Sequence, residues 1–211
     1  DLSSKNWAFM RSGNLSIAGV SCLALRISFT GDLGWEIYCE ASKQQIVYEA
    51  LVKEAINEQG GPVGSRALMS LRIEKGYGSW SREYSPEVWP HECGLDKLCK
   101  LDKEFLNKGE LEKKLKINPR ESLMLIHLNE EDCNLSNADA TGGEPIFKNG
   151  KGLGRITSGA YGYTVGMSLA LGYLRDVIPG DDVEVMVLGQ PHRGKVLRAP
   201  PFDPDGKILR S

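Results

Sequence analysis

The sequence predicts an α+β protein in which an antiparallel sheet with helices packed on it precedes a small antiparallel β-barrel. Before residue 119, two apolar strand-like runs at 20–29 and 36–39 are followed by two amphipathic helical patterns. After residue 119, short strand-like runs alternate with glycine-containing turns, a pattern typical of a small antiparallel barrel or sandwich. We therefore expect two domains, at residues 1–118 and 119–211.

A glycine-rich turn is predicted to join the first two strands. Gly31 and Gly34 lie on either side of Asp32, and glycine and aspartate reverse the chain at little steric cost because they tolerate positive φ. The two flanking strands are then expected to pair antiparallel. Asp32 is accordingly predicted to shape the turn and to take no part in chemistry.

Glu36 is the unusual residue of this region. It follows Trp35 at the start of a strand that the sequence predicts to be buried. A buried carboxylate is costly unless a partner accompanies it. We therefore expect either a ligand at Glu36 or an ion pair with a neighbouring arginine, such as Arg26 or Arg66.

Helical periodicity is clearest at 42–57, where apolar residues recur on one face and Ser42 with Gln45 fits a capping box. A second helix is predicted at 65–75 because apolar residues again recur at helical spacing. A short charged helix is predicted at 107–116, and its polar face is most simply a solvated surface.

The remaining segments of the chain are less regular. We expect residues 1–18 to be irregular or briefly helical, with a polar turn at 12–14. Residues 93–101 are predicted to form a strand that returns to the sheet. Residues 129–143 are predicted to form a polar loop.

The second half of the chain is predicted to consist mainly of short strands. Asn149 and Gly150 stand between apolar flanks, which is a strong hairpin signal. The predicted strands and hairpin lie at 122–128, 145–157, 167–174, 182–188 and 195–199.

Composition excludes several classes of function. The chain has 26 basic and 28 acidic side chains, a formal net charge of −2, which gives no electrostatic reason to expect nucleic acid or an anionic membrane as a partner. No apolar run approaches the roughly 20 residues that span a bilayer. Because the sequence opens with Asp1 and no targeting pattern, we expect a fragment or a processed product.

Several chemical signatures are missing from the sequence. The five cysteines and three histidines show no metal-ligand spacing, so we expect reduced thiols in a cytosolic or matrix-like compartment. The glycines at 150–159 fit neither a P-loop nor a dinucleotide fingerprint. No catalytic triad can be argued from the scattered histidines.

Five ordered stretches of the chain resemble the motifs of a known family. Residues 30–37, Thr-Gly-Asp-Leu-Gly-Trp-Glu-Ile, closely resemble the Thr-Gly-Glu-x-Gly-[Phe/Trp]-Glu-[Ile/Leu] signature of the glycine-cleavage T-protein (aminomethyltransferase) superfamily. Four further stretches match that superfamily in the same order, at 64–76, 90–95, 154–159 and 168–173. Within it, the segment 73–77 with Trp80 and the tail 200–204 look most like the C-terminal half of sarcosine and dimethylglycine dehydrogenases. The first domain would then be part of a folate-binding domain.

The resemblance implies a tetrahydrofolate site. Glu36 falls on the glutamate that holds the amino edge of the pterin, and Arg66 falls on an arginine that lines the folate site. Phe29 and Trp80 are the aromatic candidates for walls of that site. The competing expectations are an ion-paired Glu36, a water-exposed Arg66 at the helix start, and aromatic rings that belong to the core.

The resemblance also implies what this chain lacks. The family's catalytic aspartate lies in the N-terminal third of the folate domain, which has no counterpart here, so no catalytic residue is assigned. The flavin domain of the dehydrogenases, with its FAD, is likewise outside these residues. The implied function is to accept a one-carbon unit from an oxidised N-methyl amine and form 5,10-methylenetetrahydrofolate. This chain alone is not expected to oxidise anything.

Two other functions fit the same resemblance. One is a regulatory or binding protein on this fold, similar to the regulatory subunit of pyruvate dehydrogenase phosphatase. The other is a free-standing aminomethyltransferase. The expected location of the protein is the cytoplasm or the mitochondrial matrix.

Overall fold

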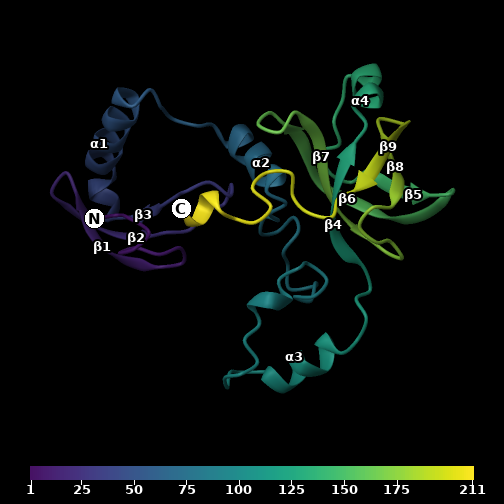
Figure 1. The fold of residues 1–211 in the computed structure, drawn as a ribbon, viewed down its shortest axis with the longest axis horizontal. Coiled ribbons are helices and arrows are strands. Elements are labelled where there is room, and N and C mark those ends of the chain that lie inside the picture. Colours follow the sequence, from purple (N-terminus) through teal and green to yellow (C-terminus); the bar gives the residue numbers. More distant parts are fainter.

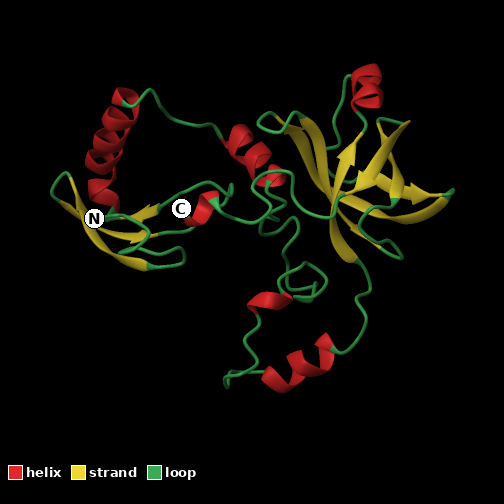
Figure 2. Ribbon diagram, in the orientation of Figure 1, coloured by secondary structure: helices red, strands yellow, loops and turns green.

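The structure is a computed structural model that describes residues 1–211. A three-stranded sheet lies at one end of the molecule and a closed six-stranded barrel at the other, with α2 between them (Figure 1). Strands outnumber helices, and long loops connect several of these elements (Figure 2). The predicted α+β class with a C-terminal barrel is confirmed. None of the helices combines the length and the apolarity needed to cross a membrane.

The small sheet has the order β1 (Ser12–Ile17), β2 (Val20–Leu25), β3 (Glu36–Tyr38), and both pairings are antiparallel. The polar turn expected at residues 12–14 is wrong, since these residues belong to β1. The actual reversal is at Ala18 and Gly19, which both have positive φ as a two-residue hairpin turn requires.

The first helices lie where the periodicity placed them. α1 spans Gln44–Asn57 and α2 spans Ser65–Glu74. The capping box is wrong, because a 3₁₀ turn at Ala41–Lys43 precedes α1 and its N-cap, Lys43, makes no side-chain cap hydrogen bond. Only Val47 of α1 is buried. α2 packs on the barrel strands β6 and β7, whereas the sequence had placed it on the sheet.

The connection to the barrel contains α3 (Lys108–Leu115) but no strand. The strand expected at 93–101 is wrong. Gly94 has φ of +75°, Leu95 N–H bonds back to the carbonyl of Pro90, and a 3₁₀ turn follows at Asp96–Leu98. The positive φ of Gly94 and the tight turns around it are incompatible with an extended strand.

The barrel runs in the order β4–β7–β6–β5–β8–β9 and every pairing is antiparallel. Asn149 and Gly150 form the predicted hairpin, and both have positive φ. The last strand begins earlier than predicted. The bounds of these strands are β4 Ser122–Leu128, β5 Pro145–Lys148, β6 Lys151–Gly162, β7 Met167–Leu174, β8 Asp182–Val187 and β9 Gln190–Val196.

The polar loop expected at 129–143 is partly wrong, because it contains α4 (Glu130–Ser136). The Asn129 side chain caps this helix by accepting the N–H of Asp132 at 3.2 Å. Three acidic residues occupy the first turn, where the helix dipole favours negative charge. Asn-Glu-Glu-Asp was therefore a helix-start signal in the sequence.

Strand β7 is buried on both faces, which explains why its sequence is almost uninterrupted by polar residues. Ala170 and Leu174 face the barrel core. Leu169 and Leu171 face outward and pack with Ile73 of α2. α2 thus packs on the outside of the barrel and buries the outer face of β7.

Close strand contact explains a glycine of β6. A Cβ built at Gly154 would lie 1.8 Å from the carbonyl oxygen of Tyr173 in β7, closer than any real contact. A Cβ built at Gly152, two residues earlier on the same strand, would make only an ordinary van der Waals contact, with Phe147 Cε1 at 3.9 Å. The two glycines therefore differ in what a methyl group would meet.

We predict that Gly154→Ala lowers the free energy of unfolding by about 2–3 kcal/mol or more, because the backbones of β6 and β7 must move apart. Gly152→Ala is the matched control and is expected to change it by less than about 1 kcal/mol. Urea unfolding followed by circular dichroism measures both. Equal effects of the two substitutions would contradict this account of the strand contact.

Glu92 ties the long connection to the start of the barrel. Its carboxylate, 1% exposed, accepts two hydrogen bonds from the Arg120 guanidinium, both at 2.8 Å, and a third at 2.9 Å from the N–H of Trp89. Hydrogen bonding and charge from Arg120, against the opposing effect of burial, lower the pKa of Glu92 to about 2. Leu123 N–H of β4 also bonds to the Glu92 carbonyl, at 2.7 Å.

The sign of this shift makes stability depend on pH. A carboxylate whose pKa is lower in the folded state stabilises above its unfolded pKa of about 4.3, and this contribution is lost as pH falls toward about 2. We predict that Arg120→Gln, which removes an exposed guanidinium, lowers the free energy of unfolding at pH 7, because the Glu92 carboxylate loses its counter-charge. The same substitution should make the free energy of unfolding fall less steeply between pH 5 and pH 2. Denaturant titrations at each pH measure this slope. An unchanged acid slope would contradict the assignment.

Candidate functional site

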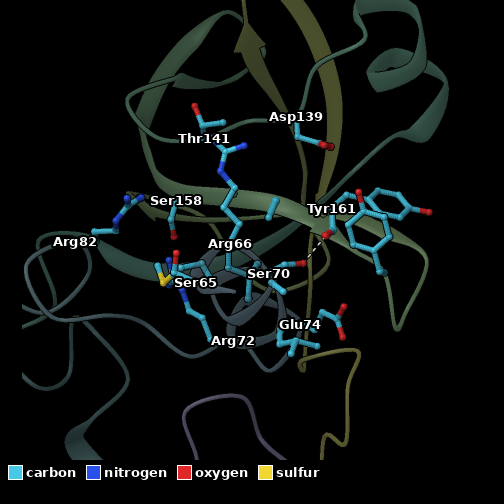
Figure 3. Close-up of a pocket in the computed structure, with 17 residues that line it drawn as sticks. Ser65, Arg66, Ser70, Arg72, Glu74, Arg82, Asp139, Thr141, Ser158 and Tyr161 are labelled. Carbon is cyan, nitrogen blue, oxygen red and sulfur yellow. Dashed lines mark hydrogen bonds between the residues drawn. The ribbon is translucent and has the colours of Figure 1, made fainter. Parts of the chain in front are cut away.

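A cavity of about 840 Å³ lies between α2 and strand β6 (Figure 3). Its volume is in the range of pockets that bind small organic molecules. α2 supplies most of one wall, β6 supplies Ser158 to Tyr161, and the loop before β5 supplies Asp139 and Thr141. Three arginines line it: Arg66, Arg72 and Arg82.

Two hydrogen bonds fasten α2 to the far end of β6. Ser70 Oγ donates to the carbonyl of Tyr161 at 2.5 Å, and the buried carboxylate of Glu74 accepts the N–H of Thr164 at 2.9 Å. Both groups lie on the buried face of α2. The helix is therefore fixed against β6 by polar contacts as well as by apolar packing.

A buried ion pair links α2 to β6, the strand on the other side of the cavity. Arg72 Nη1 lies 3.0 Å from Glu83 Oε2, and both side chains are 0% exposed. Glu83 Oε1 accepts hydrogen bonds from Ser158 Oγ at 2.5 Å and from Thr157 Oγ1 at 2.7 Å, and Oε2 accepts the N–H of Ser79 at 2.8 Å. Both carboxylate oxygens thus have several donors, which is what a buried charge requires.

A β-bulge lets two adjacent residues of β6 reach the same carboxylate. Neighbouring side chains in a regular strand point to opposite faces. The register of β6 against β7 shifts between Ile156 and Ser158, and the extra residue Thr157 turns its hydroxyl to the same side as that of Ser158. The irregularity of the strand is the reason that Glu83 has two hydroxyl donors.

These surroundings shift the pKa values of the pair. Burial pushes the pKa of Glu83 upward, but the hydrogen bonds from Ser158, Ser79 and Thr157 and the charge of Arg72 outweigh burial and hold it below its ordinary value. Burial lowers the pKa of Arg72, against the opposing effect of Glu83. Each charge of the pair therefore favours the charged form of the other, against the effect of burial.

The structure places the four sequence-predicted site residues apart. Arg66 is exposed and lines the cavity. Phe29, Glu36 and Trp80 are not among the lining residues. Phe29 is half-buried in the segment after β2, and Trp80 is 74% exposed, so the alternative that Trp80 belongs to the core is wrong.

Glu36 is not buried, so the expectation of a costly buried charge is wrong. It lies exposed on β3, and its carboxylate accepts the hydroxyl of Tyr38 at 2.6 Å. That hydrogen bond and the charge of Glu36 raise the pKa of Tyr38. The expected ion pair is also wrong: the buried Arg26 donates to the carbonyls of Trp7 and Ser211.

The glycine-rich turn before Glu36 packs against α2 and the C-terminal tail. Gly31 has φ of +90°, and a Cβ there would lie 2.5 Å from Cδ of Lys75. Lys75 Nζ in turn pairs with Asp203 Oδ2 at 3.2 Å, and both side chains are nearly buried. Three of the stretches that carried the resemblance therefore meet at Lys75, although they are far apart in the sequence.

The sequence patterns identify neither Arg72, which lines the cavity, nor its buried partner Glu83. The available signal was a run of charges, Arg72, Glu74 and Lys75, on the apolar helix face that periodicity predicts to be buried. Charges at such positions are rare unless paired. Nothing in local sequence identifies Ser158, 75 residues away, as the donor to Glu83. No three His, Cys, Asp or Glu side chains gather in a metal-binding arrangement.

Comparison with known families identifies both halves of the chain. Residues 1–103 match the family described as the GCVT N-terminal domain, and residues 125–203 match the glycine cleavage T-protein C-terminal barrel domain. The chain therefore belongs to the glycine cleavage T-protein, or aminomethyltransferase, family.

Individual relatives include dehydrogenases and transferases. The chain is 31% identical over 204 residues to human mitochondrial dimethylglycine dehydrogenase, covering 95% of this chain and 23% of that protein. It is 31% identical over 221 residues to mouse mitochondrial sarcosine dehydrogenase, covering 100% and 23%. It is 30% identical over 190 residues to an aminomethyltransferase of Desulforamulus reducens, covering 88% and 50%. The chain thus spans about a quarter of the length of these dehydrogenases.

The fold is shared with a solved structure. The glycine cleavage system aminomethyltransferase T from Bartonella henselae superposes with a TM-score of 0.81 at 20% identity, covering 96% of this chain and 55% of that one. The arrangement of sheet, α2 and barrel is therefore that of an aminomethyltransferase.

We predict that Glu83→Gln lowers the free energy of unfolding by about 3 kcal/mol, because it leaves the Arg72 charge buried without a counter-charge. Glu87→Gln, at an exposed position of the same connection, is the control and is expected to change it by less than about 0.5 kcal/mol. Chemical denaturation measures the difference. A loss no larger than that of the control would show that the pair does not hold this wall.

Proposed function

We propose that this chain is the tetrahydrofolate-binding, one-carbon-accepting module of a sarcosine or dimethylglycine dehydrogenase-like enzyme. The observation that carries the proposal is that both dehydrogenase relatives align with the chain almost from end to end. The product would be 5,10-methylenetetrahydrofolate, formed from an oxidised N-methyl group. Any FAD would be held by sequence outside these residues.

The residues present fit a folate in two places. The cavity beside α2 has room for an organic ligand, carries Arg66, and contains buried donors on Arg72 that have no acceptor. Glu36 is exposed and has its second carboxylate oxygen free of any protein hydrogen bond, so it can accept the N–H groups of a pterin edge. Because Glu36 does not line that cavity, we assign binding to the intact protein, in which both regions would face one ligand.

The chain's own contribution is positioning. Tetrahydrofolate, when bound, would supply the nitrogens that accept the one-carbon unit. Glu36 would fix the pterin by paired charge-assisted hydrogen bonds, and Arg66 would hold the ligand from α2. Phe29 and Trp80 are proposed as aromatic contacts to the ligand. Holding two reactants together raises their effective concentration, so no catalytic acid or base need come from this chain.

A free-standing aminomethyltransferase is the second candidate. It is favoured by the aminomethyltransferase relative, of which the chain covers half. The two candidates differ in whether a flavin domain precedes the chain in the intact protein. For the first candidate we propose a location in the mitochondrial matrix or the cytoplasm, since both dehydrogenase relatives are mitochondrial.

We predict that Glu36→Gln in the intact protein weakens tetrahydrofolate binding about ten- to a hundredfold, because it replaces a charge-assisted acceptor by a neutral one. Glu40→Gln, at an exposed position four residues later, is the matched control and should leave affinity unchanged. Titration calorimetry measures both, and reduction of a bound flavin by the N-methyl substrate should be the same in all three proteins. Equal folate affinity in the two variants would remove Glu36 from the site.

A further inference from the structure

We infer that the C-terminal tail, residues 200–211, is a strap that holds the small sheet and α1 in place beside α2. The sheet unit consists of residues 1–57, which contain β1, β2, β3 and α1. Release of the strap would let the sheet unit turn on the linker 58–64 that joins it to α2. The tail is therefore a conformational device of the fold.

The linker does not fix the sheet unit relative to α2. Residues 58–64 form no helix or strand, and every one of them is exposed. A Cβ built at Gly61 or Gly64 would have no neighbouring atom within 4 Å. Glycine has the widest range of backbone angles, so this linker can bend at little cost.

Polar contacts between the sheet unit and the rest of the chain converge on the tail. The hydrogen bonds of residues 1–60 stay within that segment, except the one that Arg26 donates to the carbonyl of Ser211. No ion pair involves residues 1–60. The turn at Gly31 packs on Lys75 at the end of α2, and Lys75 is itself bound by the tail.

The first residues of the tail are fixed to the end of α2. The N–H of Phe202 bonds to the carbonyl of Glu74 at 3.2 Å. Lys75 pairs with Asp203 through side chains that are 4% and 5% exposed, and the Asp203 carboxylate also accepts the N–H of Lys207 at 2.8 Å. Removal of one partner of such a pair is costly, because the other charge stays buried.

The last residues of the tail are fixed to the sheet unit. Figure 1 shows the tail leaving β9, passing α2 and ending beside the small sheet. The guanidinium that binds Ser211 belongs to Arg26, which is 1% exposed. The Arg210 guanidinium carbon lies 5.9 Å from the centroid of the Phe9 ring, within the range of a cation–π contact, and Leu209 is 2% exposed. This end of the tail is therefore packed.

The strap has a consequence for the ligand site. Glu36 lies in the sheet unit and Arg66 lies on α2, so the two residues are on opposite sides of the linker. If both contact one ligand, the strap sets the separation between them. This consequence rests on the proposed function, whereas the strap itself rests on the contacts of the tail.

The test is a measurement of backbone N–H residual dipolar couplings by NMR in the 211-residue chain and its variants, without folate. In the unaltered chain, the couplings of the sheet unit and of the barrel should fit one alignment tensor. Removal of residues 208–211 cuts the anchor on the sheet unit. The two parts should then need separate tensors, with the magnitude for the sheet unit about half that of the barrel or less.

Asp203→Ala cuts the other anchor and should also require separate tensors. Asp205→Ala, at an exposed position of the same tail, is the matched control and should keep one tensor. A single shared tensor in either strap variant, or equal separation in Asp203→Ala and Asp205→Ala, would overturn the inference. Loss of the folded signals of the sheet unit on removal of 208–211 would also overturn it, because the tail would then be part of the unit's core. A failure of tetrahydrofolate binding at Glu36 leaves all these results readable.

Discussion

The buried ion pair of Arg72 and Glu83 is the contact on which the centre of this molecule depends. It joins α2 to the connection that follows it, and through Ser158 and Thr157 it joins both to β6. Tyr173 of β7 adds a hydrogen bond to the Glu83 carbonyl at 2.6 Å. A buried pair repays its desolvation only when further hydrogen bonds complete it. Glu83 has several such bonds, whereas Arg72 has one, to the carbonyl of Tyr77, and its Nε and Nη2 have no acceptor.

The contacts of this ion pair lie beside the cavity. The cavity lies where α2, β6 and the loop before β5 meet, so its shape is set by strands and a helix that are fixed to one another. The glycine-rich turn reaches the other end of α2 through Lys75. α2 is therefore the element that connects the glycine-rich turn before Glu36 with the barrel.

Local patterns in the sequence were sufficient for most elements but gave little about burial. The period of apolar residues located α1, α2 and the barrel strands, and Asn149-Gly150 located a hairpin. The same period assigned α1 an apolar face, yet only Val47 of that face is buried, and Ile46 and Leu51 are exposed. Glu36 was expected to be buried for the same reason. Periodicity shows which residues share a face, but not whether another element covers that face.

The sequence by itself determined the family and the α+β class with a C-terminal barrel, because motifs and periods are local properties of the chain. Only the tertiary structure decided that α2 packs on the barrel, that Glu36 is exposed, and that Arg72 pairs with Glu83. The physical reason is that the fate of a charge depends on partners brought by the fold. Glu83 meets Ser158 across 75 residues and through a β-bulge, and neither the distance nor the bulge has a signature in the local sequence.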